Sequence, residues 1–212
     1  MKNRIIIALD GISEKEALRV AKIMKGHVWG FKINDLLFEG LDIIGKFKRF
    51  GHVFADAKLY DIPNTVKNSV ARLSKAGADM ITVHSSGGIE MMKAAKQSAG
   101  RSKILAVSVL TSKSDSRMVA MLTKDAIKAK VDGIICSGLE LKNIRRIPES
   151  QSLLKVVPGI RPEWYLKKDD QKRTMTPERA LKFGADYLVI GRPVLNSKDS
   201  MQALKDIYLP SS

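Results

Sequence analysis

Short apolar runs alternate with amphipathic stretches along the whole chain of 212 residues. Eight of the runs are rich in β-branched residues and carry little charge, which is typical of strands buried on both faces of a parallel sheet. We expect strands at residues 4–10, 29–33, 52–58, 80–84, 103–110, 133–137, 154–158 and 187–191. Between them, apolar residues at helical spacing predict helices that include 13–25, 63–77, 89–99 and 177–184.

One short pattern recurs. The segment 76–83, Ala-Gly-Ala-Asp-Met-Ile-Thr-Val, resembles the segment 183–190, Phe-Gly-Ala-Asp-Tyr-Leu-Val-Ile, and residues 130–135 are a weaker copy. Each copy predicts a helix end, a tight turn and a buried strand, so the chain repeats one αβ unit. Eight such units predict a (β/α)8 TIM barrel that forms one domain over residues 1–212. An open doubly wound sheet is the alternative, but no G-x-G-x-x-G motif follows the first predicted strand.

The composition is that of a globular protein in a reducing compartment. Hydrophobic residues make up 44% of the chain and charged residues 28%, and no apolar stretch approaches the roughly 20 residues of a membrane span. The apolar run at the N-terminus is too short for a signal peptide. Cys136 is the single cysteine, so no internal disulfide can form. We therefore expect a cytoplasmic protein without a membrane partner.

The formal charge of +15 favours an anionic partner, which could be a nucleic acid or a phosphorylated metabolite. The lysines are scattered along the predicted helices, however, and do not alternate with aromatic residues that could stack on bases. We therefore expect a small anionic ligand and no nucleic acid.

Ionisable side chains gather where the predicted strands end. Asp56 and Lys58 are two residues apart and share one face of a strand, and Asp61 follows in the loop, from which it could turn inward or reach a neighbouring subunit. A surface salt-bridge cluster is the simpler interpretation of three such residues. Other strand ends contribute Asp10, Lys32, His84, Ser108, Thr111, Arg161 and Arg192. Because the carboxyl ends of all barrel strands meet at one face, we expect an active site there.

Two features near the C-terminus predict a site for a phosphate group. Gly191 lets a backbone N–H approach an oxyanion, and Arg192 can bind two of its oxygens. The loops after the last two strands are also where barrel enzymes often bind phosphate.

The longest irregular stretch, residues 161–175, follows the seventh predicted strand, and we expect it to be a mobile lid.

These motifs resemble the orotidine 5′-monophosphate decarboxylase family over nearly the whole chain, in the short form found in archaea and bacteria. The most specific motif is the ten-residue string 56–65, Asp-Ala-Lys-Leu-Tyr-Asp-Ile-Pro-Asn-Thr. The other motifs are Ala8-Leu9-Asp10, Phe31-Lys32, Val109-Leu110-Thr111-Ser112, Pro158-Gly159-Ile160-Arg161, Asp170-Gln171-Lys172-Arg173 with Met175-Thr176-Pro177, and Ile190-Gly191-Arg192.

The resemblance implies a carboxy-lyase of pyrimidine biosynthesis that converts orotidine 5′-monophosphate to uridine 5′-monophosphate and CO2 without a metal or cofactor. It implies a homodimer in which Asp61 and Thr65 of one subunit complete the site of the other. The implied catalytic residues are Lys58, Asp56, Asp61 and Lys32. The implied substrate-binding residues are Asp10, Lys32, Asp56, Ile62, Thr65, Ser108, Thr111, Pro158, Gly159, Arg161, Gln171, Gly191 and Arg192.

The resemblance also implies a role for each of these residues. Asp10 and Lys32 would hold the ribose hydroxyls, and Gln171, Gly191 and Arg192 would bind the phosphate, with Arg161 at the base of the lid. Thr111 would contact the pyrimidine edge, and Ser108 is the second candidate for that contact. The role of His84 is left open between a ligand contact and core packing.

The chemistry of the reaction agrees with these roles. Loss of CO2 from the pyrimidine ring leaves a carbanion, and no motif for an electron-sink cofactor is present. A fixed ammonium group, that of Lys58, could stabilise the carbanion and then protonate it. The alternative is a Mg2+-dependent sibling of the same barrel family, such as 3-keto-L-gulonate 6-phosphate decarboxylase or hexulose-6-phosphate synthase. Those enzymes usually carry a glutamate ligand where this chain has Lys32.

Overall fold

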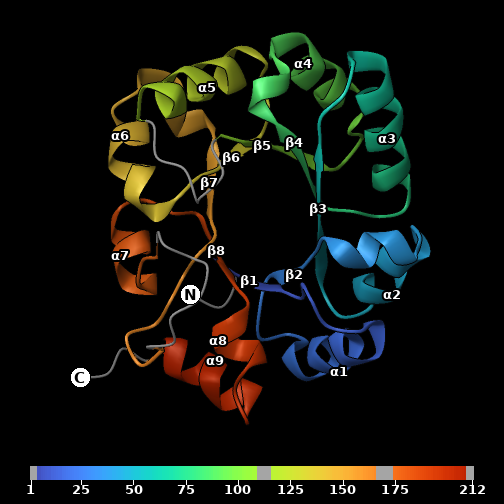
Figure 1. Cartoon of the computed structure of the whole chain (residues 1–212), viewed down its shortest axis with the longest axis vertical. Coiled ribbons are helices and arrows are strands. Elements are labelled where there is room, and N and C mark those ends of the chain that lie inside the picture. The colour runs from blue at the N-terminus through green and yellow to red at the C-terminus, as the bar shows by residue number, and fades with distance from the viewer. Residues whose placement is uncertain (1–3, 109–115, 166–173, 209–212) are drawn as a thin grey trace.

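Eight parallel strands form a closed barrel in which each strand pairs with its neighbours in chain order and β8 pairs with β1 (Figure 1). The computed structural model describes residues 4–108, 116–165 and 174–208. The strands are β1 (Ile5–Ala8), β2 (Gly30–Ile33), β3 (His52–Leu59), β4 (Met80–His84), β5 (Lys103–Val107), β6 (Gly133–Ile135), β7 (Leu154–Val157) and β8 (Tyr187–Ile190). The prediction of a (β/α)8 barrel is confirmed.

Helices surround the barrel in a single outer layer (Figure 1). The α-helices are α1 (Glu14–Met24), α2 (Asp42–Lys48), α3 (Pro63–Lys75), α4 (Ile89–Ser98), α5 (Ser116–Lys128), α6 (Leu141–Arg145), α7 (Pro177–Lys182), α8 (Arg192–Leu195) and α9 (Ser200–Tyr208). Short 3-10 helices are η2 (Asp35–Glu39), η3 (Ser85–Gly87), η4 (Gly138–Glu140) and η5 (Pro148–Ser152). None of the helices in the described part of the chain is long and apolar enough to cross a membrane.

Every predicted strand and each of the four predicted helices is present. The predicted strands at 4–10, 133–137, 154–158 and 187–191 end earlier in the structure, because the chain leaves the sheet to form the loops that carry the site. Strand β3 is instead one residue longer than predicted, and it contains an irregularity that is described below. The predicted strand 103–110 ends at Val107, and its last two positions lie outside the described residues.

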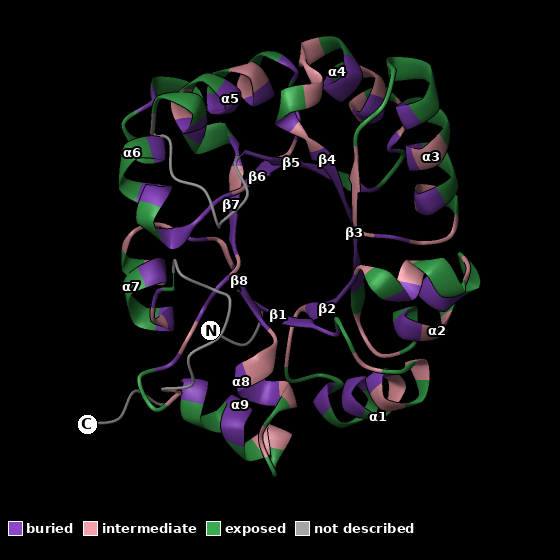
Figure 2. Cartoon of the chain, in the orientation of Figure 1, coloured by how far each residue is buried: buried purple, intermediate pink, exposed green. Residues whose placement is uncertain are grey.

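The core has two layers. Inside the barrel, apolar side chains of alternate strand positions fill the interior; the buried ones are Ile6, Ala8, Phe54, Met80, Leu105, Val156 and Val189. The intervening positions face outward and pack under the helices, whose buried faces turn toward the sheet (Figure 2). This alternation explains why the strands are apolar on both faces.

The aspartate of the recurring pattern forms a structural clamp at the amino ends of the strands in all three copies. An aspartate that precedes an even-numbered strand accepts a hydrogen bond from a backbone N–H of the preceding odd-numbered strand and donates its own N–H to the carbonyl of the same residue. The pairs are Asp79 with Val53, Asp132 with Ile104 and Asp186 with Lys155. Lys48 also pairs with Asp79, and Lys96 with Asp132. These clamps therefore join neighbouring strands at the face opposite the candidate site.

Candidate active site

Charged side chains of alternating sign form a row at the carboxyl ends of β1, β2 and β3. The Lys32 Nζ lies 2.8 and 2.7 Å from the two Asp10 carboxylate oxygens and 3.1 Å from Asp56 Oδ2. The same Asp56 oxygen accepts a hydrogen bond from Lys58 Nζ at 2.6 Å. Lys32 and Asp56 are buried, whereas the side chains of Asp10 and Lys58 are 45% and 36% exposed. The row thus runs from solvent through a buried centre to an accessible ammonium group.

Strand β3 leaves its regular path in the stretch that carries Asp56 and Lys58. Its pairing with β4 shifts register between Ala55 and Leu59, and Lys58 has a φ of +46°. That conformation is unfavourable for a residue with a Cβ, and such strain gathers at functional sites. Because the Lys58 N–H is out of step with the ladder, it donates instead to Thr82 Oγ1 at 2.9 Å. The irregularity turns the lysine into the mouth of the barrel beside Asp56.

Two polar residues that the sequence analysis did not identify hold Asp56. Thr82 Oγ1 lies 2.9 Å from Asp56 Oδ1, and Asn34 Nδ2 donates to the Asp56 backbone carbonyl at 2.6 Å. Thr82 is fully buried. The sequence offered a signal for each residue. Thr82 is a threonine within the apolar run of β4, in step with the inward-facing Met80, and Asn34 is an amide two residues after Lys32.

The row fixes the charge of its buried members. Burial of Lys32 opposes the charged form, but Asp56 and Asp10 outweigh burial and raise the pKa of its ammonium group above the usual value. Burial of Asp56 likewise opposes its charge, but Lys32 and Lys58 outweigh it and hold the pKa of the carboxyl below its usual value. Lys32 and Asp56 are therefore both ionised at neutral pH.

A cavity of about 600 Å3 opens beside Lys32. Seven residues that the sequence analysis placed in the site line it: Asp10, Lys32, Pro158, Gly159, Arg161, Gly191 and Arg192. Gly159 has a φ of +74° that favours glycine. The cavity is also lined by Ala8, Gly11, Ile12, Val189, Leu195 and Asn196. The structure therefore brings the ends of β1, β2, β7 and β8 together around one space.

The two ends of the segment expected to form a lid meet beside this cavity. The Arg161 N–H donates to the Met175 carbonyl at 3.0 Å, and the Met175 N–H donates to the Gly159 carbonyl at 3.3 Å. The Arg161 guanidinium donates to the Ile160 carbonyl and lies 5.8 Å from the centre of the Tyr165 ring. Residues 166–173, including Gln171, lie outside the described residues, so the mobility of the lid stays a prediction.

Three predicted site residues do not join the row in their own chain. Ile62 and Thr65 are exposed at the start of α3, and Asp61 is exposed just before it. The Asp61 carboxylate accepts a hydrogen bond from the Ile62 N–H at 2.7 Å. Within the described residues, Asp56 is the carboxylate that pairs with Lys58. The side chains of Asp61, Ile62 and Thr65 are therefore exposed outside the row of their own chain.

Of the two candidates for the pyrimidine contact, the structure describes Ser108. Thr111 lies outside the described residues. Ser108 is buried after β5, and its hydroxyl donates to the Ile135 carbonyl at 3.0 Å, which leaves its oxygen as a hydrogen-bond acceptor.

His84 ends β4 on the mouth side, in step with Thr82, and its ring makes an edge contact with Tyr60. Burial, with Lys58 as the second cause, lowers the pKa of its imidazole despite the opposing effect of Asp56. The imidazole is therefore neutral at pH 7.

Among the described residues, no group of three or more histidine, cysteine, aspartate or glutamate side chains is arranged to hold a metal ion. The Asp10 and Asp56 carboxylates both contact the Lys32 ammonium group. This ammonium group therefore lies between the two carboxylates.

Known proteins resemble the chain over nearly its full length. The family model for the orotidine 5′-phosphate decarboxylase / HUMPS family matches residues 3–207. An orotidine 5′-phosphate decarboxylase of Streptococcus agalactiae serotype Ia is 44% identical over 184 residues, which cover 80% of this chain and 78% of that protein. The corresponding protein of Dichelobacter nodosus is 40% identical over 222 residues, which cover 96% of both chains.

Solved structures give the same result. The crystal structure of orotidine 5′-phosphate decarboxylase from Lactobacillus acidophilus has a TM-score of 0.81 at 34% identity and covers 97% of both chains. The enzyme from Pyrococcus horikoshii has a TM-score of 0.79 at 28% identity and covers 96% of this chain and 97% of the other. With the match of the family model and the row of charges at the barrel mouth, these similarities establish that the chain belongs to the orotidine 5′-phosphate decarboxylase / HUMPS family.

Proposed function

We propose that this protein decarboxylates orotidine 5′-monophosphate to uridine 5′-monophosphate and CO2, a step of pyrimidine biosynthesis, in the cytoplasm. The observation that carries the proposal is the accessible Lys58 ammonium group fixed on the buried, ionised Asp56 at the mouth of the barrel. Relatives with this function in their names match most of the chain.

The chemical step needs a positive charge beside the carbon that loses CO2. The Lys58 ammonium supplies it, stabilises the carbanion that forms, and donates a proton to that carbon. Asp56 accepts a hydrogen bond from Lys58 Nζ at 2.6 Å and so fixes the position of the ammonium group. Its negative charge also lies near the substrate carboxylate, and the repulsion between them is relieved when CO2 leaves.

The rest of the substrate extends into the cavity. Gly191 and Arg192 at the start of α8 bind the phosphate, and Asp10 and Lys32 bind the ribose hydroxyls. Gln171 is a further predicted phosphate ligand. Arg161 lies at the base of the predicted lid, and the binding energy of the phosphate drives closure over the site.

The reaction proceeds without a metal or cofactor in this proposal. Lys32 stands where Mg2+-dependent siblings usually carry a glutamate ligand, and its ammonium group repels a divalent cation. Its buried contacts with Asp10 and Asp56 are satisfied without such an ion.

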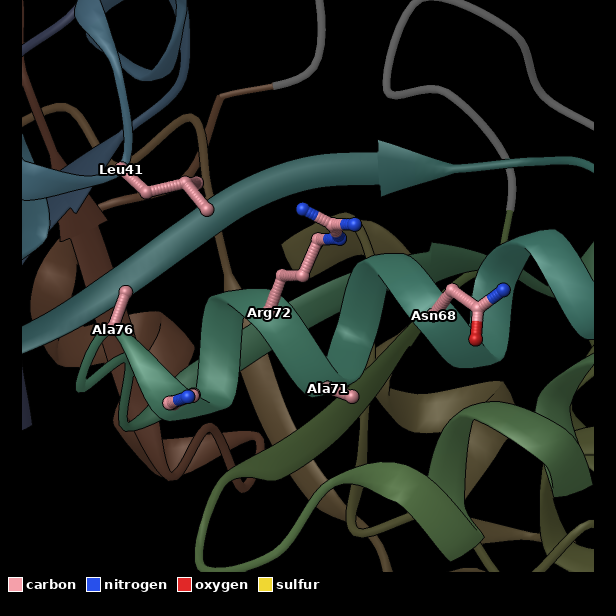
Figure 3. Close-up of a pocket in the computed structure, with 6 residues that line it drawn as sticks. Leu41, Asn68, Ala71, Arg72 and Ala76 are labelled. Carbon is pink, nitrogen blue, oxygen red and sulfur yellow. The ribbon is translucent and has the colours of Figure 1, made fainter.

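We further propose that two copies of the chain associate so that Asp61 and Thr65 complete the site of the partner. Exposed apolar side chains lie beside α3. Ile62 at its N-terminal end is 66% exposed, and Phe38, which lines a hollow with Ser69, Arg72 and Leu73, is 93% exposed. This hollow, which Leu41 also lines, adjoins a second one along α3, where Asn68, Arg72 and Ala76 follow one another with Leu41 opposite (Figure 3). Exposed apolar side chains such as Phe38, Leu41 and Ile62 are typical of protein interfaces.

The test is to mix EDTA-treated protein with orotidine 5′-monophosphate and to follow the pyrimidine absorbance. We expect conversion by the wild-type protein and its loss, by at least about 1000-fold, in Lys58→Ala. The control is Lys93→Ala, which removes an exposed lysine of α4 that pairs with Glu90 and should leave the rate unchanged. Activity that requires Mg2+, or is absent with this substrate, would instead favour a sibling that acts on sugar phosphates.

A further inference from the structure

Thr82 connects the two residues at the centre of the proposed chemistry. Its side chain is fully buried and points into the barrel from the middle of β4. Its Oγ1 lies 2.9 Å from the Lys58 backbone nitrogen and 2.9 Å from Asp56 Oδ1. One hydroxyl group therefore contacts both the Lys58 backbone and the Asp56 carboxylate.

The chemistry of the hydroxyl fixes the direction of both hydrogen bonds. The Lys58 N–H can only donate, so Thr82 Oγ1 is the acceptor of that bond. An ionised carboxylate can only accept, so the single hydroxyl proton of Thr82 points to Asp56 Oδ1. The other carboxylate oxygen, Oδ2, is left to Lys32 and Lys58. Thr82 therefore fixes the rotation of the carboxylate that holds both ammonium groups.

The backbone of β3 explains why a side chain is needed at this point. Regular pairing with β4 is interrupted between Ala55 and Leu59, and Lys58 adopts its left-handed conformation within the interruption. A buried N–H without an acceptor is costly, so a left-handed residue persists only if its surroundings satisfy it. The Thr82 hydroxyl is the acceptor that replaces the ladder carbonyl.

We propose that Thr82 is a positioning residue for the decarboxylation, which holds the Lys58 backbone and the Asp56 carboxylate in the geometry that places the Lys58 ammonium group. The proposal rests on the proposed function. Thr82 acts through Asp56 and Lys58 and does not itself touch the reacting carbon.

The test compares Thr82→Val, which has nearly the same shape without the hydroxyl, with Thr82→Ser, which keeps the hydroxyl. The matched control is Thr123→Val, since Thr123 is also fully buried but its hydroxyl bonds to the Val119 carbonyl within α5. We expect Thr82→Val to lower kcat by about 10- to 100-fold, the effect of a small misplacement of a catalytic group. Its KM should change by less than about threefold, because the phosphate ligands are untouched.

Two further results are expected if Thr82 acts by positioning. Thr82→Ser should keep kcat within about threefold of the wild type, and Thr123→Val should lower the melting temperature without lowering kcat. If Thr82→Val is insoluble, Thr82→Ala removes the same hydroxyl without any steric demand and replaces it in the comparison.

The outcomes separate the two proposals. A wild-type protein that does not decarboxylate orotidine 5′-monophosphate overturns the proposed function. An active wild type with an unaffected Thr82→Val overturns the positioning role alone. The role is also overturned if Thr82→Ser is as slow as Thr82→Val, or if Thr123→Val loses kcat to the same extent.

Discussion

Replacing Asp56 with asparagine is expected to destabilise the protein strongly at neutral pH and less strongly as the pH approaches about 10. The substitution keeps the shape of the side chain and removes its charge. Asp56 is buried and contacts the Nζ atoms of both Lys32 and Lys58 through one oxygen, at 3.1 and 2.6 Å. The variant therefore retains two ammonium groups at the barrel mouth without the carboxylate that lies between them.

The magnitude follows from the separation of these two charges. Because both Nζ atoms touch the same oxygen, they lie less than about 6 Å apart, and at an effective dielectric constant of about 20 their repulsion is about 3 kcal/mol. Asp10 still pairs with Lys32 in the variant but is half exposed, so it compensates only in part. We expect a loss of about 3 kcal/mol in the free energy of unfolding at pH 7, as for other broken buried ion pairs.

The pH dependence comes from Lys32. In the wild-type protein the pKa of Lys32 is raised despite burial, because Asp56 and Asp10 favour the charged form. The stability that Lys32 contributes is therefore complete below the unfolded pKa of about 10.4, and it is lost only as the pH rises through the folded pKa. In the variant, Asp10 alone opposes burial and the charge of Lys58, so we expect the folded pKa of Lys32 to fall below the unfolded value. A folded pKa below the unfolded one means that stability is regained as the pH rises between the two values.

Urea unfolding of both proteins between pH 7 and 10 measures this difference. The control is Asp79→Asn, which removes the partner of Lys48; because the Lys48 side chain is 42% exposed, the loss in that variant should not shrink at high pH. A destabilisation by Asp56→Asn below about 1 kcal/mol, or one that stays constant from pH 7 to 10, would refute the reasoning.

Three further predictions concern the phosphate site, the clamps and the interface. Arg192→Ala should raise KM for orotidine 5′-monophosphate about 10- to 100-fold with a smaller change in kcat, because it removes charge-assisted hydrogen bonds to the phosphate; an unchanged KM in steady-state kinetics would contradict this. Asp132→Asn should lower the free energy of unfolding by about 1–3 kcal/mol, since Ile104 and Lys96 lose a charged acceptor, and kcat measured on the same preparation should not change. Phe38→Asp should convert the proposed dimer to monomers in sedimentation velocity, and a wild-type protein that is already monomeric would refute the proposed interface.

The fold could be predicted from the sequence because its determinants are local. Eight buried runs, separated by amphipathic stretches, leave few topologies other than a barrel, and the residue after each run lies at the mouth. The sequence predicted that Asp56 and Lys58 lie together at a strand end, and their contact of 2.6 Å confirms it. The contact is made within the irregularity of β3, so regular strand alternation does not by itself account for it.

The parts of the site that were missed depend on relations between strands. Thr82 meets Lys58 only because β3 slips against β4 after Ala55, and no single run of the sequence contains that information. The Asn34 side chain donates to the backbone carbonyl of Asp56. Because any residue at position 56 has that carbonyl, the identity of Asp56 does not indicate this contact. Residues that hold the chemistry in place are therefore harder to find than those that perform it.

The aspartate clamps have a consequence for how such a barrel can change over time. Each clamp joins residues only 26, 28 or 31 positions apart. Closing a loop of this length costs little chain entropy, so we expect these contacts between neighbouring strands to form early in folding. The opposite ends of β3, β5 and β7 lie at the mouth. Substitutions at the mouth therefore leave the aspartate clamps in place. A protein with this barrel can acquire a different reaction in evolution while its folding remains intact.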